Sequence, residues 1–225
     1  MQDDTPNARE SLARQLAEAV AEALRHDLEA RERVLLVVSG GSTPVPFFRA
    51  LAATALPWSR IDVTLADERW VAESADDSNA RLVRRELLQG KAAEARFTPL
   101  TSAAETPEEG VAEVAARVEA LPWPASAVVL GMGGDGHTAS LFPDSPELSL
   151  ALSTAEPVVA VRTPSQPQAR ITLSADRLHQ CPRHFLHITG EEKRAVLGRA
   201  LAGDDTRALP VRAFLASPLG IYWAP

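Results

Sequence analysis

The run Val-Leu-Leu-Val-Val at residues 34–38 is apolar at every position and is followed at once by Ser-Gly-Gly-Ser-Thr-Pro. Such a run is typical of a strand that other elements cover on both faces, as happens in parallel sheets. Two further predicted strands, at 61–66 and 127–132, also lead into polar sequence. The chain is therefore expected to adopt an α/β fold built on a mostly parallel sheet.

Helical and strand patterns alternate along the rest of the chain. Small and apolar residues recur at four-residue steps between 7 and 31, which predicts a helix with one buried stripe. The other predicted helices are at 77–89, 107–120 and 191–202, and the other predicted strands at 158–162, 169–173, 184–189 and 220–223. Because no repeat or linker interrupts this order, we expect residues 1–225 to form one three-layer Rossmann-like domain, with helices flanking the sheet.

Charge and cysteine content exclude several classes of function. The 225 residues carry a formal net charge of −7 and a single cysteine, Cys181. The acidic balance argues against a nucleic-acid surface, and no apolar run reaches the roughly 18 to 20 residues that span a bilayer. A lone cysteine makes neither an internal disulfide nor a cysteine-based metal cluster. With a polar N-terminus unlike a secretion signal, the chain is expected to be cytoplasmic, without a nucleic-acid or membrane partner.

Polar sequences that could carry chemistry follow four of the predicted strands. They are SGGST after 34–38, DER after 61–66, GGDGH at the end of 127–132, and GEEK after 184–189. In open α/β sheets, ligands bind beyond the carboxyl ends of the strands, and these four sequences would meet there. We therefore expect one site to which all four contribute.

Residues 39–44 permit two interpretations. Gly40 and Gly41 suit a strand-to-helix turn in which Ser42 or Thr43 caps the next helix and Pro44 lies in its first turn. The same residues also suit a phosphate cradle, because the free N–H groups and dipole at a helix N-terminus favour an anion. The segment is not a Walker A loop, since no Gly-Lys-Ser/Thr follows.

Glycines shape the loop that follows the strand at 127–132. They are Gly131, Gly133, Gly134 and Gly136. Three of them fit the spacing G-x-G-x-x-G, which in dinucleotide-binding domains opens a long helix, with an acidic residue about 20 positions later. Here Pro143 interrupts the segment after the loop, and residues 39–44 already supply a phosphate loop. We interpret the glycine loop as a tight turn that presents Asp135 and His137.

His137 is the strongest candidate for proton transfer, because histidine accepts and returns a proton near neutral pH. Asp135 stands two residues earlier and could orient it. The remaining histidines are interpreted as surface residues; these are His26, His179, His184 and His187. His184 and His187 would face opposite sides of a strand, which makes them a poor metal pair.

Charged residues near the strand ends complete the candidate site. Asp67, Glu68 and Arg69 follow the strand at 61–66 directly. Arg170 and Lys193 are donors suited to an anion, arginine as a bidentate fork and lysine as a point charge. Any anion site in so acidic a chain must rest on a few placed cations and backbone N–H groups. No G-x-S-x-G or other local signature of a nucleophilic triad is present.

Together these segments resemble the 6-phosphogluconolactonases, within the wider group that includes glucosamine-6-phosphate isomerase/deaminase. The resemblance covers nearly the whole chain, and its central block is highly specific. It is carried by SGGSTP (39–44), DERWV (67–71), SNARL (78–82), LGMGGDGHTASLFP (130–143), ARITL (169–173) and ITGEEK (188–193).

The resemblance implies hydrolysis of 6-phospho-D-glucono-1,5-lactone to 6-phosphogluconate, the second step of the oxidative pentose phosphate pathway, without a metal or organic cofactor. It implies that His137 is the general base and that Arg69 lies near the lactone. Asp67 and Asp135 complete the expected catalytic group, with less defined roles. The expected phosphate ligands are Gly40, Gly41, Ser42, Thr43, Arg170 and Lys193. The expected partner is this small anionic sugar-phosphate lactone, bound by a monomer.

One departure distinguishes the two activities of the wider group. The related deaminases carry a glutamate five residues after the histidine, whereas this chain has Phe142 followed by Pro143. Deaminase or isomerase chemistry is therefore disfavoured. Smaller departures are Ala72 and the C-terminal YWAP, neither of which touches an assigned residue. A sugar-phosphate sensor is a further alternative, which would need the phosphate ligands but not His137.

Overall fold

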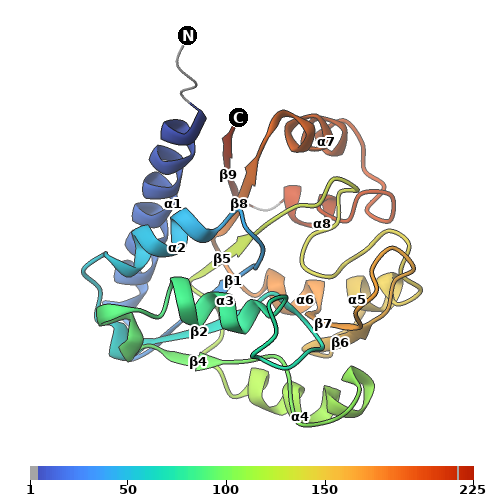
Figure 1. Ribbon diagram of the computed structural model, residues 1–225, viewed down its shortest axis with the longest axis horizontal. Coiled ribbons are helices and arrows are strands. Elements are labelled where there is room, and N and C mark those ends of the chain that lie inside the picture. Colours follow the sequence, from blue (N-terminus) through green and yellow to red (C-terminus); the bar gives the residue numbers. More distant parts are fainter. Residues whose placement is uncertain (1–4, 217) are drawn as a thin grey trace.

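The computed structural model describes residues 5–216 and 218–225. At its centre lies a six-stranded sheet in the order β4-β2-β1-β5-β8-β9, in which all neighbouring strands are parallel (Figure 1). The strands are β1 (Val34–Val38), β2 (Ile61–Leu65), β4 (Arg96–Thr98), β5 (Ala127–Leu130), β8 (His184–Thr189) and β9 (Leu219–Ala224). Every residue of β1, β2 and β5 is buried, as the apolar sequences of β1 and β5 predicted. The expected α/β fold with a parallel sheet is confirmed.

A second, smaller sheet was not expected. It contains β3 (Asp67–Arg69), β7 (Arg170–Leu173) and β6 (Val158–Val161), and its pairs are antiparallel. Residues 67–69, expected only as polar sequence after the strand at 61–66, form a strand because β7 provides a partner for this short charged segment. Ala66 joins the two sheets: its N–H donates to Val38 and its carbonyl accepts from Leu173.

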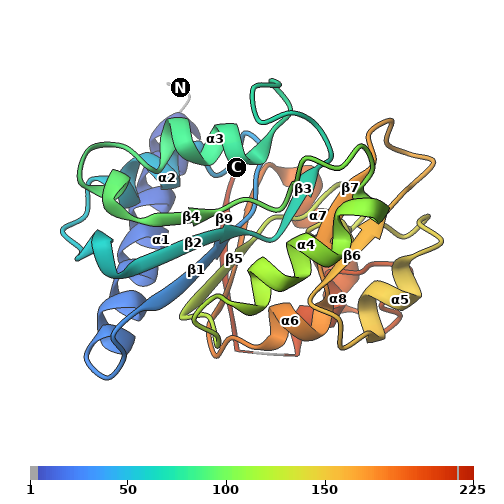
Figure 2. The same ribbon diagram turned by 90° about the horizontal axis from the view of Figure 1, so that it is seen from below.

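Helices cover both faces of the large sheet, as Figures 1 and 2 show. Phe47 of α2 packs against His187 of β8, whereas His184 of the same strand packs against Phe214 of α8. One face therefore carries α1 and α2, and the opposite face carries α6 and α8. The helices are α1 (Thr5–Leu28), α2 (Val45–Ala52), α3 (Asn79–Glu86), α4 (Pro107–Glu119), α5 (Leu148–Ser153), α6 (Ala175–His179), α7 (Glu191–Leu201) and α8 (Arg212–Leu215). Across residues 5–216 and 218–225, no helix is long and apolar enough to cross a membrane.

The start of α2 differs from the expected capped turn. The helix begins at Val45 with Pro44 as its N-cap, and no side chain caps it. The Ser42 carbonyl accepts a backbone hydrogen bond from Val45, but its hydroxyl and that of Thr43 bond no residue in the described part of the chain. Both hydroxyls therefore stay free for another partner.

The interpretation of four histidines as surface residues is correct for two of them and wrong for the other two. His26 and His179 are exposed, but His184 and His187 are only 2% and 4% exposed. Both lie on β8, which is covered on its edges by β5 and β9 and on its faces by helices. Their opposite orientations are as expected for an odd spacing on a strand.

Candidate active site

The carboxyl ends of the central strands surround an open cavity of about 270 Å³. Its wall includes the sequence after β1, both ends of β3, the first residue of β7, the glycine loop after β5, and the start of α7. Most of the expected site residues line it; these are Gly40, Gly41, Ser42, Thr43, Asp67, Arg69, Gly131, Gly133, His137, Arg170 and Lys193. Asp135, Gly134 and Gly136 lie in the same loop but outside the lining.

His137 is held at the mouth of this cavity by Asp135. The two side chains meet at 2.6 Å, between His137 Nδ1 and Asp135 Oδ1, and the same oxygen accepts the His137 backbone N–H at 3.1 Å. Partial burial would raise the pKa of Asp135, but the hydrogen bond and charge of His137 outweigh this and lower it. An ionised Asp135 accepts a hydrogen bond from the N–H on His137 Nδ1, which leaves the lone pair of the neutral ring on Nε2.

The glycine loop and a phenylalanine fix the plane of the His137 ring. A Cβ atom on Gly133 would lie 2.2 Å from ring atoms Cε1 and Nδ1, so only glycine allows this approach. The Phe142 ring packs on the histidine with its centroid 4.3 Å away. Gly136 closes the turn with φ +80°, and its N–H donates to the Gly133 carbonyl at 3.1 Å. The imidazole therefore has little freedom to turn.

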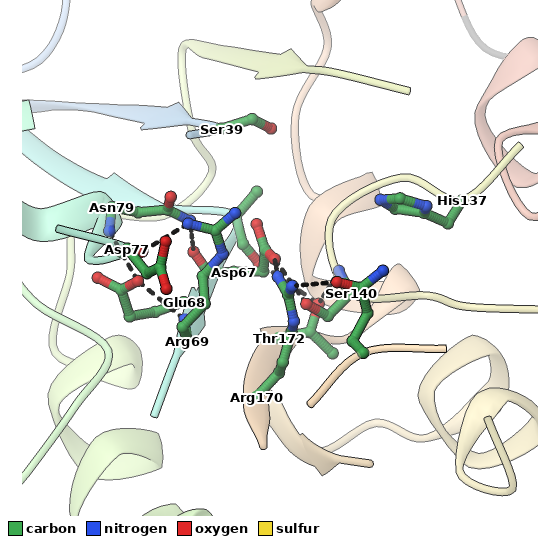
Figure 3. Close-up of polar contacts among 12 residues, drawn as sticks. Ser39, Asp67, Glu68, Arg69, Asp77, Asn79, His137, Ser140, Arg170 and Thr172 are labelled. Atoms are coloured by element: carbon green, nitrogen blue, oxygen red, sulfur yellow. Dashed lines mark hydrogen bonds and ion pairs between the residues drawn. The ribbon is translucent and has the colours of Figure 1, made fainter. Parts of the chain in front are cut away.

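Two arginines of the small sheet line the same cavity as His137 (Figure 3). Arg69 on β3 lies opposite Arg170 on β7, and both line the cavity. The Arg69 guanidinium donates to the Asp77 carbonyl. The Arg170 guanidinium lies 3.7 Å from Asp67 Oδ2, and Ser140 Oγ donates to that oxygen at 2.5 Å. Burial lowers the pKa of Arg170, and the charge of Asp67 partly offsets this.

The end of the cavity formed by residues 40–43 and Lys193 contains several hydrogen-bond donors without a partner among the described residues. The backbone N–H groups of residues 40–43 donate no hydrogen bond within the described part of the chain, and Gly41 has φ +90°. Lys193, in the first turn of α7, forms no ion pair with a described residue. Burial lowers its pKa, against a smaller opposing effect from Glu192. These free N–H groups, two hydroxyls and a partly desolvated ammonium together suit an anion.

Three residues to which the sequence assigned no role at the site also shape it. Asn79, 3% exposed, donates from Nδ2 to the Asp67 carbonyl at 3.0 Å, and its Oδ1 has no partner among the described residues. Glu68 fixes the start of α3 by accepting from the N–H groups of Asn79 and Ala80 at 2.8 and 2.7 Å. Burial raises the pKa of Glu68, although these hydrogen bonds act in the opposite direction. The third residue is His187, which lines the cavity.

The sequence held only partial signals for these three residues. Asn79 follows Ser78, a recognisable N-cap whose Oγ accepts from the Arg81 N–H at 3.2 Å. Nothing in the sequence indicates that the Asn79 side chain turns toward Gly40, where an added Cβ would meet its Oδ1 at 1.8 Å. Within the described residues, no group of three or more His, Cys, Asp or Glu side chains could hold a metal ion.

The site and fold have close counterparts among known proteins. A family model described as glucosamine-6-phosphate isomerases/6-phosphogluconolactonase matches residues 7–223. A 6-phosphogluconolactonase of Pseudomonas aeruginosa is 50% identical over 215 residues, which cover 95% of this chain and 90% of that protein. One from Rhizobium meliloti is 46% identical over 220 residues, covering 96% of this chain and 95% of that protein.

Solved structures extend the comparison. The crystal structure of a 6-phosphogluconolactonase from Shewanella baltica has a TM-score of 0.94 and 44% sequence identity, covering 96% of this chain and 94% of that chain. A monomeric glucosamine-6-phosphate deaminase has a TM-score of 0.78 at 18% identity, covering 96% of this chain and 93% of that chain. The second likeness shows the fold alone, so fold does not distinguish a lactonase from a deaminase.

Proposed function

We propose a lactonase activity for this chain, which belongs to the family of glucosamine-6-phosphate isomerases and 6-phosphogluconolactonases. The reaction is hydrolysis of 6-phospho-D-glucono-1,5-lactone to 6-phosphogluconate. The observation that carries the proposal is the 2.6 Å contact between His137 Nδ1 and Asp135, in a cavity that also contains Arg69, Arg170 and Lys193. A positioned base among cations fits a substrate that has both a phosphate and a hydrolysable carbonyl.

His137 acts as the general base. Its Nε2 accepts a proton from water while the water oxygen bonds to C1 of the lactone, which gives a tetrahedral oxyanion. The bond between C1 and the ring oxygen then breaks, and the proton on Nε2 passes to that oxygen, which becomes the C5 hydroxyl. The carboxylic acid product ionises in water. General acid–base catalysis of this kind contributes about 10²- to 10⁴-fold in rate.

Positive charge stabilises the oxyanion and orients the substrate. Arg69 is the donor for the developing charge, because it lines the cavity and its guanidinium makes only one hydrogen bond among the described residues, to the Asp77 carbonyl, whereas Arg170 is paired with Asp67. One such donor contributes about 3–4 kcal/mol to related acyl transfers. The N–H groups of residues 40–43, the hydroxyls of Ser42 and Thr43, Arg170 and Lys193 bind the phosphate. Binding of the phosphate, which is remote from C1 in the substrate, holds the lactone in place for attack.

Phe142 favours hydrolysis over deamination. Its ring is 1% exposed, packs on His137, and lies 5.3 Å from the Arg170 guanidinium. A phenyl ring transfers no proton, so it cannot replace the glutamate expected there in a deaminase. A sensor that only binds sugar phosphates would not need the His137–Asp135 contact. Three further proposals accompany the activity: residues 1–225 act as one domain, the protein is a monomer, and it works in the cytoplasm.

A comparison of two substrates tests the proposed activity. Freshly made 6-phosphogluconolactone is mixed with the protein in EDTA, and acid release is followed against the uncatalysed rate. The same protein is incubated with glucosamine 6-phosphate, and ammonia is measured. Rapid acid release without ammonia supports the lactonase. Acid release at the background rate together with ammonia production would show a deaminase in place of the lactonase. If neither acid nor ammonia is produced, the protein would be one that only binds sugar phosphates.

A further inference from the structure

His187 is the one histidine besides His137 that lines the cavity. It lies on β8 with its side chain directed toward α2, where its ring meets Phe47 edge-on at a centroid distance of 6.2 Å. The residue is 4% exposed. The Lys193 charge acts on the ring, and Phe47 belongs to α2, the helix that follows residues 40–44, so His187 belongs to the end of the cavity with the unused donors.

The His187 ring has polar atoms without partners. Neither ring nitrogen bonds a residue in the described part of the chain, and Nδ1 is fully buried. His184, on the other face of β8, is just as buried and its Nδ1 also lacks a partner among the described residues, but its Nε2 contacts the Leu178 carbonyl at 2.9 Å. Buried polar groups in native proteins nearly always have a hydrogen-bond partner, and those that lack one call for an explanation such as a bound ligand. A ligand in the cavity would supply the partner missing at Nε2, the ring nitrogen that is not fully buried.

The surroundings of His187 determine its charge. Burial, and then the nearby Lys193 ammonium, lower the pKa of His187 to about 4. The ring is therefore neutral near pH 7, with one N–H donor and one acceptor nitrogen. A neutral donor beside Lys193 and the free N–H groups of residues 40–43 adds a directional hydrogen bond for an anion without adding charge.

We propose that His187 donates a hydrogen bond to the phosphate group of the substrate and so helps select phosphorylated over unphosphorylated lactones. This assignment rests on the proposed lactonase function for the identity of the substrate, but not for the binding of phosphate. The proposal makes His187 a specificity residue and not a catalytic one. His187 lies on β8, whereas the residues assigned to the reaction, His137 and Arg69, come from the loop after β5 and from β3. It also accounts for a histidine in the interior of a strand whose other central residues are apolar.

Substitutions on the two faces of β8 test the proposal. His187→Phe retains a ring against Phe47 but removes the N–H donor, and His187→Gln restores a donor. His184→Phe is the matched control, because it replaces an equally buried histidine of the same strand outside the cavity. The readouts are kcat and KM for 6-phosphogluconolactone and for glucono-1,5-lactone, and binding of inorganic phosphate by calorimetry.

We expect His187→Phe to weaken phosphate binding about tenfold, the loss of one hydrogen bond to a charged group. The preference in kcat/KM for the phosphorylated lactone should fall by a similar factor, through KM, and His187→Gln should recover much of it. His184→Phe should match wild type. Equal losses with both lactones, or unchanged phosphate binding in both His187 variants, would overturn the proposal. If wild type hydrolyses neither lactone, the proposed activity fails, while phosphate calorimetry still decides the role of His187.

Discussion

Replacing Asp135 with asparagine should reduce catalysis without affecting substrate binding. The substitution keeps the shape of the side chain but removes the charge that faces His137 Nδ1 at 2.6 Å. A hydrogen bond to a charged group contributes about 1.5–3 kcal/mol. The Asp135 side chain is 44% exposed, so water screens the interaction and the lower end applies. A loss of about 1.5 kcal/mol corresponds to about a tenfold lower kcat/KM.

The assay is the initial rate of 6-phosphogluconolactone hydrolysis, with the spontaneous rate subtracted. The decrease should appear in kcat, because Asp135 does not line the cavity. Asp205→Asn is the matched control: Asp205 also accepts the backbone N–H two residues later, at 2.9 Å, but lies outside the cavity. It should behave as wild type. A wild-type kcat in Asp135→Asn, or an effect confined to KM, would refute the role of Asp135 in orienting His137.

Three further predictions follow from the packing and charge of the site. In Gly133→Ala, the new Cβ would lie 2.2 Å from the His137 ring; kcat should fall by about 100-fold with little change in melting temperature, which kinetics and calorimetry can separate. In Gly40→Ala, the Cβ would meet Asn79 Oδ1 at 1.8 Å, and denaturant titration should show a loss of about 1–3 kcal/mol in unfolding free energy. The pKa of His187 is lowered from 6.5 to about 4, so between these values the unfolded chain binds a proton that the folded chain does not. Stability should therefore fall as the pH falls through this window, and His187→Phe should remove up to about 3 kcal/mol of that decline.

The central sheet could be predicted because its signal is local. The residues of β1 are all apolar and all buried, and a strand with two covered faces requires this pattern. The convergence of polar loops at one edge follows from parallel strand direction. The small sheet had no such signal at β3, whose sequence Asp-Glu-Arg has neither alternation nor an apolar face. Its partner β7 is about a hundred residues away in the chain (compare Asp67 with Thr172), and short local patterns do not encode such pairings.

The sequence predicted those site residues whose type indicates their chemistry. It missed the residues whose role depends on tertiary contacts. His137, Arg170 and Lys193 could be chosen as a base and two anion-binding cations. Ser42 was expected as a possible helix cap, but α2 starts with Pro44 as its N-cap. His187 was taken for a surface residue, because histidines mostly are, and only the placement of β8 between β5 and β9 buries it.

The most direct test of the account is the hydrolysis of freshly made 6-phosphogluconolactone by wild type and by His137→Ala, against the uncatalysed rate and without added metal. We predict rapid hydrolysis by wild type and a loss of about 100-fold or more in kcat for the variant, the contribution expected of a general base. Hydrolysis by the variant at the wild-type rate would contradict the role of His137. A wild-type rate no faster than the spontaneous one would contradict the proposed function itself.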